Sequence, residues 1–176
     1  MKKVIVTGGA GFIGYNLCKQ LVSLGHKVMS IDNYSTGLES NHIEGVEYIR
    51  EDICNEKKIF NLFKEAKVVF HLAALARIQP SFYQPKKYFN SNILGTFNIC
   101  HICDTYNIKT CIITRGKDGM TVYDSKKFCH IKSKIKDVFD VSGAGDTVIA
   151  TLATYTARGK NLIDAAKIAN LAAQHV

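Results

Sequence analysis

The chain has 176 residues, of which 47% are hydrophobic and 22% charged, so it can bury a core and is not a disordered chain. The formal net charge is +8, but Lys and Arg are spread thinly outside residues 124–136. We therefore do not expect a nucleic-acid partner, and the charge by itself does not distinguish between anionic ligands, since nucleotides and sugar phosphates are anions too. No apolar run approaches the roughly 18 residues of a membrane span, and glycines soon follow "MKKVIV". We expect neither a membrane span nor a signal peptide, and a cytoplasmic location.

The first two thirds of the chain alternate between short apolar runs and segments whose apolar residues recur at helical spacing. The predicted strands are residues 2–7, 26–33, 46–52, 67–74 and 109–114. The predicted helices cover residues 12–25, 56–66 and 88–107. This alternation predicts the α/β class, with a doubly wound, Rossmann-like parallel sheet of about five strands.

The pattern changes after residue 114. Residues 120–124 and 127–135 alternate as a β-hairpin does, and two helical segments follow, 147–159 and 161–176. We divide the chain into residues 1–110 and 111–176. No flexible linker separates these segments, so we expect them to pack as one continuous α/β domain.

A glycine-rich turn follows the first strand and opens the first helix. Gly8, Gly11 and Gly14 would allow a tight turn, close approach of a pyrophosphate, and close packing of helix on strand. Asp32 ends the second strand about 20 residues further on, where a carboxylate can accept hydrogen bonds from an adenosine ribose. A carboxylate there disfavours a 2′-phosphate. The motif therefore predicts NAD as cofactor.

Residues 1 to about 110 resemble the extended short-chain dehydrogenases that act as nucleotide-sugar epimerases and dehydratases. The resemblance rests on "VTGGAGFIGYNL", "DNYSTG", "EDI", "VVFHLAALA" and "NSNILGTFNIC". It implies an NAD site made of Gly8, Gly11, Phe12, Ile13, Gly14, Asp32, Asn33, Asp52, Ile53, Leu72, Ala73, Ala74 and Asn92. We interpret His71 as a packed histidine at a strand end rather than a catalytic group.

The same resemblance implies catalysis by a Tyr and a Lys spaced Y-x-x-x-K, with a Ser or Thr upstream. Tyr123 and Lys127 have that spacing, and Thr114 precedes them. However, Thr114 is only nine positions before Tyr123, and the surrounding residues alternate as in a hairpin instead of starting a long helix. We keep the pair as a candidate, interpret its spacing as coincidence, and do not expect complete epimerase chemistry.

A second glycine-rich motif, "DVSGAGDT", occupies residues 140–147. Gly143, Ala144 and Gly145 at a helix start can direct N–H groups at a phosphoryl group, and Asp146 can take a proton from a sugar hydroxyl. Residues from about 108 onward resemble the C-terminal part of ribokinase-like sugar kinases, of the heptose-phosphate type. The resemblance implies ATP and magnesium as cofactors, with the segment from Thr114 to Gly119 and Asn170 around the nucleotide.

We interpret the chain as composite, with an epimerase-like segment joined to a kinase-like segment near residues 107–114. Three functions stay open: an NAD-binding module with a nucleotide or sugar-nucleotide ligand, an ATP-dependent sugar kinase, and an inactive composite fold. Apolar surface is expected to be covered by the last two helices or by a second subunit, as in a homodimer. Cys100 and Cys103 form a C-x-x-C without a second pair, so no metal site is expected.

Overall fold

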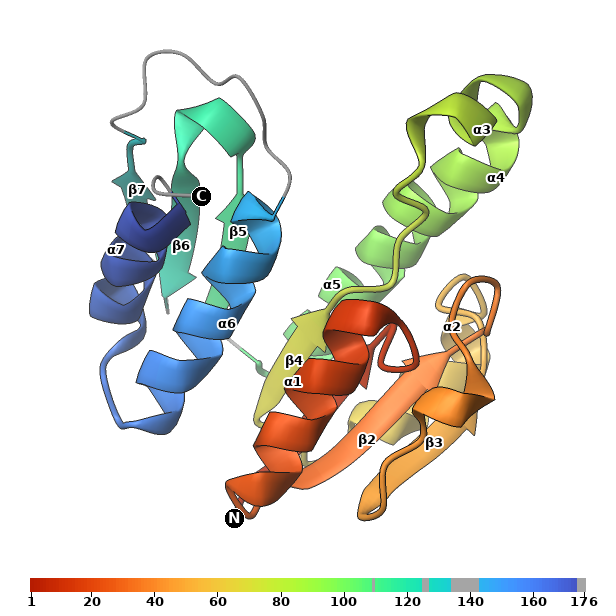
Figure 1. Ribbon diagram of the computed structural model, residues 1–176, viewed down its shortest axis with the longest axis horizontal. Helices are drawn as coiled ribbons and strands as arrows, with labels where there is room; N and C mark the ends of the chain where they lie inside the picture. Colours follow the sequence, from red (N-terminus) through yellow and green to blue (C-terminus); the bar gives the residue numbers. More distant parts are fainter. Residues whose placement is uncertain (109, 125–126, 134–142, 174–176) are drawn as a thin grey trace. The chain divides into compact units, whose positions relative to one another are not determined.

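A computed structural model describes residues 1–108, 110–124, 127–133 and 143–173 (Figure 1). The chain divides into two compact units, Met1–Ile108 (unit 1) and Lys109–Val176 (unit 2). In the described part of the chain, every helix is too short or too polar to span a membrane.

Unit 1 contains a four-stranded parallel sheet in the order β3-β2-β1-β4. Its strands are β1 (Lys3–Thr7), β2 (Lys27–Asp32), β3 (Val46–Arg50) and β4 (Val68–His71). The central strand β1 is buried along Val4, Ile5 and Val6, as expected for a strand covered on both faces. In the register, Thr7 pairs with Ile31 on one side and with His71 on the other. The carboxyl ends of β1, β2 and β4 therefore meet at one edge of the sheet.

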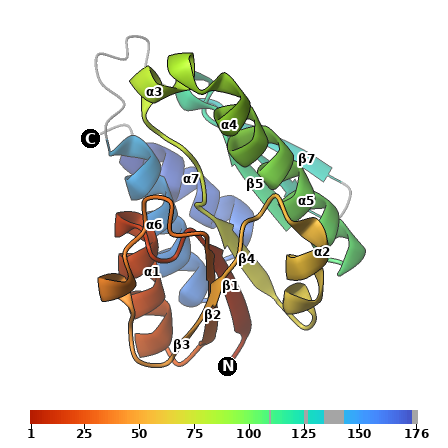
Figure 2. The same ribbon diagram turned by 90° about the vertical axis from the view of Figure 1, so that its right-hand side faces the viewer.

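Helices cover both faces of this sheet, with α1 (Phe12–Ser23) on one side and α5 (Gly95–Thr105) on the other (Figures 1 and 2). The core on the α5 side joins Ile5 and Ile31 to Ile99, Ile102 and Phe63. The shorter helical elements of the unit are η1 (Glu39–Asn41), α2 (Glu56–Ile59), η2 (Phe60–Phe63), α3 (Ile78–Tyr83), α4 (Pro85–Phe89) and η3 (Asn90–Leu94). η3 is a single π-helical turn between α4 and α5, so the predicted helix 88–107 continues through it.

Unit 2 is a three-stranded antiparallel sheet in the order β5-β6-β7, packed against two helices. Its elements are β5 (Thr110–Thr114), η4 (Gly116–Asp118), β6 (Met120–Asp124), β7 (Lys127–Ile131), α6 (Ala144–Ala157) and α7 (Leu162–Ala172). Met120 and Val122 form a core with Val148, Ala166 and Ala169. α7 begins at an Asn161 cap, whose side-chain oxygen accepts the Asp164 N–H at 2.9 Å. Such a cap stabilises a helix by about 1 kcal/mol.

The α/β class, the hairpin and the two C-terminal helices are confirmed, but the parallel sheet has four strands and not about five. The predicted fifth strand is β5, which pairs antiparallel with β6. The antiparallel pairing follows from the tight connection between β5 and β6, in which the Arg115 N–H donates to the Gly119 carbonyl at 2.7 Å. A short connection of this kind joins antiparallel neighbours, whereas parallel neighbours need a crossover. Apolar composition alone did not distinguish the two.

Candidate functional site

The turn between β1 and α1 is closely packed at two of its three predicted glycines. Gly8 has φ +76°, and a Cβ on it would lie 2.8 Å from the Ala73 nitrogen. A Cβ on Gly14 would overlap the Gly8 carbonyl oxygen and lie 2.6 Å from the Gly9 Cα. Both obstacles are backbone atoms, which cannot rotate away. Glycine is therefore required at these two positions by the fold itself.

Gly11 differs, because its own surroundings leave room for a side chain. Its φ is −79°, and a Cβ there would meet nothing closer than the Gly8 oxygen at 3.4 Å. Gly11 is also one of the residues that line a cleft. α1 starts directly after Gly11 with no side-chain cap and no acidic residue in its first turn. Its first N–H groups and its helix dipole are therefore suited to an anion in the cleft.

The cleft lies at the carboxyl end of the parallel sheet and gathers most of the predicted NAD-binding residues. Those that line it are Gly8, Gly11, Asp32, Asn33, Ile53, Leu72, Ala73 and Ala74. Phe12 and Ile13 begin α1, and the Phe12 side chain is 81% exposed, so only their backbone is suited to an anion. Sequence reasoning missed Ser35, Thr36 and Ser91, which also line the cleft. Ser35 and Thr36 follow the predicted pair Asp32–Asn33 after one intervening residue, Tyr34, and this proximity was the available signal.

The Asp32 carboxylate is held at the end of β2 by two backbone donors. One oxygen accepts the Ala10 N–H at 3.0 Å and the other accepts the Tyr34 N–H at 2.8 Å. Tyr34 has φ +58°, a conformation that costs energy for a residue with a side chain, and the bond to Asp32 stabilises it. Each carboxylate oxygen keeps a further lone pair for a ligand hydroxyl.

Asn33 and Asp52 form a second polar pair. The Asn33 amide donates to Asp52 Oδ2 at 2.8 Å, and Asp52 Oδ1 accepts the Cys54 N–H at 2.8 Å. Burial raises the pKa of the Asp52 carboxyl, but these hydrogen bonds favour the charged form more strongly, so its pKa is lowered. Asp52 is therefore ionised at neutral pH and ties the end of β2 to the loop after β3.

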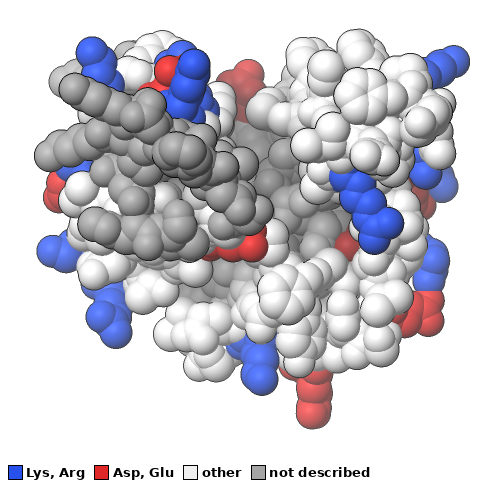
Figure 3. Space-filling model, turned by 45° about the horizontal axis from the view of Figure 1, so that its top comes forward, with Lys and Arg blue, Asp and Glu red and all other residues white. Residues whose placement is uncertain are grey.

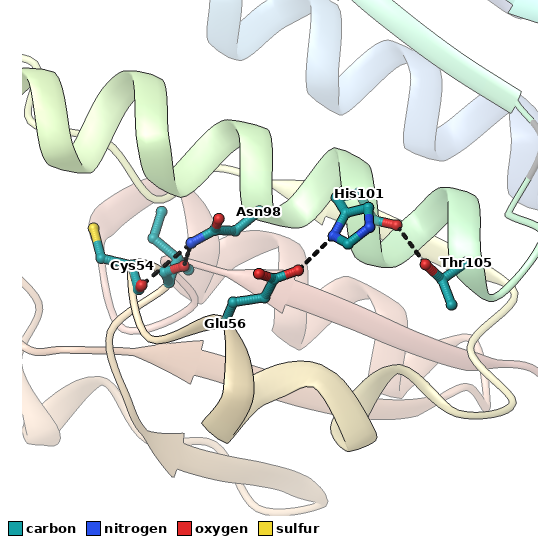
Figure 4. Close-up of polar contacts among 6 residues, drawn as sticks. Cys54, Glu56, Asn98, His101 and Thr105 are labelled. Carbon is teal, nitrogen blue, oxygen red and sulfur yellow. Dashed lines mark hydrogen bonds and ion pairs between the residues drawn. The ribbon is translucent and has the colours of Figure 1, made fainter.

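α5 holds the loop that contains Ile53 (Figure 4). The Asn98 amide donates to the carbonyl oxygens of Ile53 and Cys54 at 3.0 and 3.2 Å. Glu56 Oε1 lies 2.5 Å from His101 Nδ1 one turn further along the helix. Gly95 lets the helix approach, because a Cβ on it would lie 2.5 Å from Ile53 Cδ1. One wall of the cleft is thus fastened to α5.

The preceding π turn holds the opposite wall. The Asn92 side chain accepts the Leu75 N–H at 2.8 Å and donates to the Leu75 carbonyl at 2.9 Å. These contacts place Asn92 behind the wall, and its neighbour Ser91 is the residue of this turn that lines the cleft. The sequence carried no signal for this, since a single π turn changes which residues of a helix share a face.

The two catalytic candidates of the epimerase type lie in the hairpin of unit 2. Tyr123 is on β6 and Lys127 is the first residue of β7. The Tyr123 ring packs on Phe128, with centroids 4.9 Å apart. Neither residue starts a helix.

The predicted phosphoryl-transfer residues surround the start of α6. Gly143 has φ +86° and precedes the helix, Ala144 and Gly145 form its first turn, and Asp146 is exposed there. Residues 140–142 of the motif lie outside the described residues. Asn170 is 7% exposed and donates to the Lys132 carbonyl at 3.0 Å, so its amide supports unit 2 rather than projecting to solvent. No group of three or more His, Cys, Asp or Glu side chains within the described ranges is arranged to hold a metal ion.

Comparison with known families matches both parts of the chain. Residues 4–117 match the model of the NAD dependent epimerase/dehydratase family. The chain belongs to this family. Residues 95–176 also match the pfkB family of carbohydrate kinases, so the two-part description from the sequence is confirmed.

Curated relatives and solved structures on the epimerase side agree. A bifunctional UDP-glucose and UDP-xylose 4-epimerase of Pisum sativum is 31% identical over 135 residues, which cover 69% of this chain and 38% of that protein. The structure of a Thermus thermophilus UDP-glucose 4-epimerase in complex with NAD matches with a TM-score of 0.58 and 35% identity, over 61% of this chain and 35% of that one. The structure of a Thermotoga maritima UDP-glucose 4-epimerase with UDP-glucose matches with a TM-score of 0.59 and 31% identity, over 61% of this chain and 35% of that one. This epimerase/dehydratase family member thus spans well under half the length of these relatives.

Proposed function

We propose that the chain is an NAD-binding module of the epimerase/dehydratase family that takes a nucleotide or sugar nucleotide as a further ligand. Gly11 carries the proposal: neither its conformation nor its packing requires glycine, yet it lines the cleft beside the start of α1. The orphan N–H groups of α1 fit a pyrophosphate, and the Asp32 carboxylate fits the hydroxyls of an adenosine ribose. Similarity to epimerases solved with NAD and with UDP-glucose supports the same ligands.

In this proposal the chain's own residues bind and orient the cofactor. The turn from Gly8 to Gly14 would hold the pyrophosphate, Asp32 and Asn33 the adenosine ribose, and Asp52 and Ile53 would flank the adenine. Leu72, Ala73 and Ala74 would form the wall toward the nicotinamide. Bound NAD would supply a hydride acceptor.

We propose further that epimerase chemistry is incomplete. An acid–base pair of this type has its Tyr at the start of a helix that also carries the Lys, whereas Tyr123 and Lys127 lie on the two strands of a β-hairpin. In this proposal the chain joins an epimerase-like and a kinase-like segment, and it binds NAD without catalysing the complete epimerase reaction.

Phosphoryl transfer is the second candidate function, favoured by the pfkB match over residues 95–176. The exposed Asp146 in the first turn of α6 would act as base, with the backbone of Gly143 to Gly145 facing the phosphoryl group. ATP and magnesium would then be the cofactors. This function also needs a sugar pocket, which neither the motif nor the first turn of α6 provides.

A thermal melt with NAD, and with ATP–magnesium in parallel, tests these alternatives. NAD at about 100 times its dissociation constant should stabilise the protein by roughly 2.7 kcal/mol. We expect Tm to rise by on the order of 5–10 °C. A shift with ATP–magnesium alone would make kinase chemistry the primary function. A cooperative unfolding transition whose Tm changes with neither ligand would support the inactive composite fold.

A second copy of the chain is the proposed protein partner. Large apolar side chains are exposed along α4, η3 and α5, among them Phe89 (56%), Ile93 (57%) and Phe97 (64%). In Figure 3 much of the visible surface at this end of unit 1 is uncharged, with Lys and Arg side chains at its edges. Contiguous exposed apolar surface of this kind commonly marks an interaction site.

A double change of Ile93→Glu and Phe97→Glu is therefore expected to convert a homodimer to a monomer, because it buries two charges in the interface. Light scattering after size exclusion measures the mass. Thr105→Glu, at an exposed position of the same helix, is the control and should leave the dimer intact. A wild-type protein that is monomeric at high micromolar concentration would contradict the proposal.

A further inference from the structure

His71 is a titratable side chain at the end of β4 that the proposed cofactor contacts do not use. Its Nδ1 lies 2.7 Å from the Thr7 hydroxyl of β1, and its Nε2 lies 2.9 Å from the Thr96 hydroxyl of α5. The imidazole therefore bridges the central strand and α5, the helix that follows the π turn η3 directly. The groups that face it from β1 and α5 are hydroxyls, which do not titrate near neutral pH.

The hydrogen bonds around Thr7 determine which nitrogen of His71 carries the proton. The Thr7 hydroxyl oxygen accepts the N–H groups of Leu72 and Ala73 at 3.2 and 3.3 Å. A hydroxyl has two acceptor lone pairs and one proton. The Leu72 N–H is shared between the two Thr7 oxygens, because it also donates to the Thr7 carbonyl oxygen at 3.1 Å. With two N–H groups directed at the Thr7 hydroxyl oxygen, the hydroxyl donates its own proton to His71 Nδ1. His71 must then be neutral, with its proton on Nε2.

The Nε2 side of the His71 ring has a defined hydrogen-bond direction as well. His71 Nε2–H donates to the Thr96 hydroxyl, which in turn donates to the Asn92 carbonyl at 2.7 Å. The Asn92 side chain holds both backbone groups of Leu75. A directional chain of hydrogen bonds thus runs from Thr7 through His71, Thr96 and Asn92 to Leu75. Its two ends hold the two ends of the Leu72–Leu75 segment.

We propose that His71 is a positioning residue for the cleft: as the neutral Nε2–H tautomer it links Thr7 to Thr96 and fixes the Leu72–Leu75 wall against which NAD binds. This inference rests on the proposed function. To the proposed NAD site it adds His71, which acts through Thr7 and Thr96 rather than by touching the ligand.

The proposal implies sensitivity to acid. A proton on Nδ1 would face the Thr7 oxygen, whose lone pairs already bind the N–H groups of Leu72 and Ala73, so that the wall would have to move. Burial lowers the pKa of His71 below its usual value. The neutral form therefore persists at neutral pH. NAD affinity should fall as the pH drops through the lowered pKa of His71.

Removal of the Thr96 hydroxyl tests the chain of hydrogen bonds. Thr96→Val keeps the side-chain shape and should weaken NAD binding, measured by calorimetry, by about tenfold, the change expected for one lost hydrogen bond of a network. Thr105→Val is the matched control on the same helix: the Thr105 hydroxyl likewise donates to the carbonyl four residues earlier, that of His101, at 3.0 Å (Figure 4). We expect it to bind NAD within twofold of wild type. Equal affinities for the two variants would overturn the proposal.

Two measurements without NAD separate this proposal from the proposed function. Nitrogen-15 NMR of the wild-type imidazole should show the Nε2–H tautomer at pH 7, and amide hydrogen exchange at Leu72, Ala73 and Leu75 should accelerate in Thr96→Val but not in Thr105→Val. An Nδ1–H tautomer or an imidazolium at pH 7 would overturn the assignment even if NAD binds. A wild-type protein with the Nε2–H tautomer and a protected wall that does not bind NAD would contradict the proposed function and leave the hydrogen-bond chain supported.

Discussion

Gly14→Ala is expected to destabilise unit 1 by about 3 kcal/mol and to abolish NAD binding. Its Cβ would overlap the Gly8 carbonyl oxygen and lie 2.6 Å from the Gly9 Cα. Backbone on both sides prevents relaxation, so α1 would have to move away from the turn that it packs on. In a thermal melt, Tm should fall by more than about 10 °C for a unit of this size.

Gly11→Ala is the matched comparison, since it makes the same chemical change three residues earlier. Its backbone conformation suits alanine, and the nearest atom to the new Cβ is 3.4 Å away. We expect stability within about 1 kcal/mol of wild type, because replacing glycine at a compatible conformation costs little or stabilises. NAD affinity should nevertheless fall by on the order of 100-fold, since the methyl group occupies the position that a pyrophosphate needs. Unchanged affinity in Gly11→Ala would mean that the cleft does not take a pyrophosphate at this turn.

The second large effect is expected at Asp32, which should make the protein prefer NAD to NADP by on the order of 100-fold. A carboxylate about 4 Å from a phosphate is repelled by several kcal/mol at an effective dielectric constant near 20, and solvent screening reduces this. In Asp32→Asn the preference should shrink to less than about tenfold, because an amide carries no charge. Dissociation constants for both cofactors, measured by calorimetry, give the ratio directly.

The same substitution has a structural cost that must be measured separately. Asp32 accepts the N–H groups of Ala10 and Tyr34, and an amide can accept only one of them. We expect a loss of about 1–2 kcal/mol of unfolding free energy. Asp104→Asn is the control, since it changes the charge equally but Asp104 is exposed on α5 and does not line the cleft. A selectivity that falls as far in Asp104→Asn as in Asp32→Asn would contradict a specific role for Asp32.

Strands, turns and site residues were predictable from the sequence where a short segment of the chain determines them. The buried run of β1, the glycines of the first turn and Asp32 at the end of β2 each follow from a short segment. The sheet partner of β5 did not follow, because an apolar run fits a parallel or an antiparallel neighbour equally well. The resemblance named Asn92 as a site residue, but its contacts with Leu75 did not follow from the sequence, since they depend on the π turn η3 and on a residue 17 positions away in the chain.

The strand order β3-β2-β1-β4 leaves β4 at the edge of the parallel sheet, and β1 is its one sheet neighbour in the described ranges. β4 is only four residues long, and its Val68-Val69-Phe70 run is half-buried and uncharged. The outer N–H and C=O groups of such an edge are a template onto which an extended segment of another molecule can add. Strand addition to unit 1 would therefore begin at β4, and a charged residue in place of one of its uncharged residues would protect the unit against self-association through the backbone.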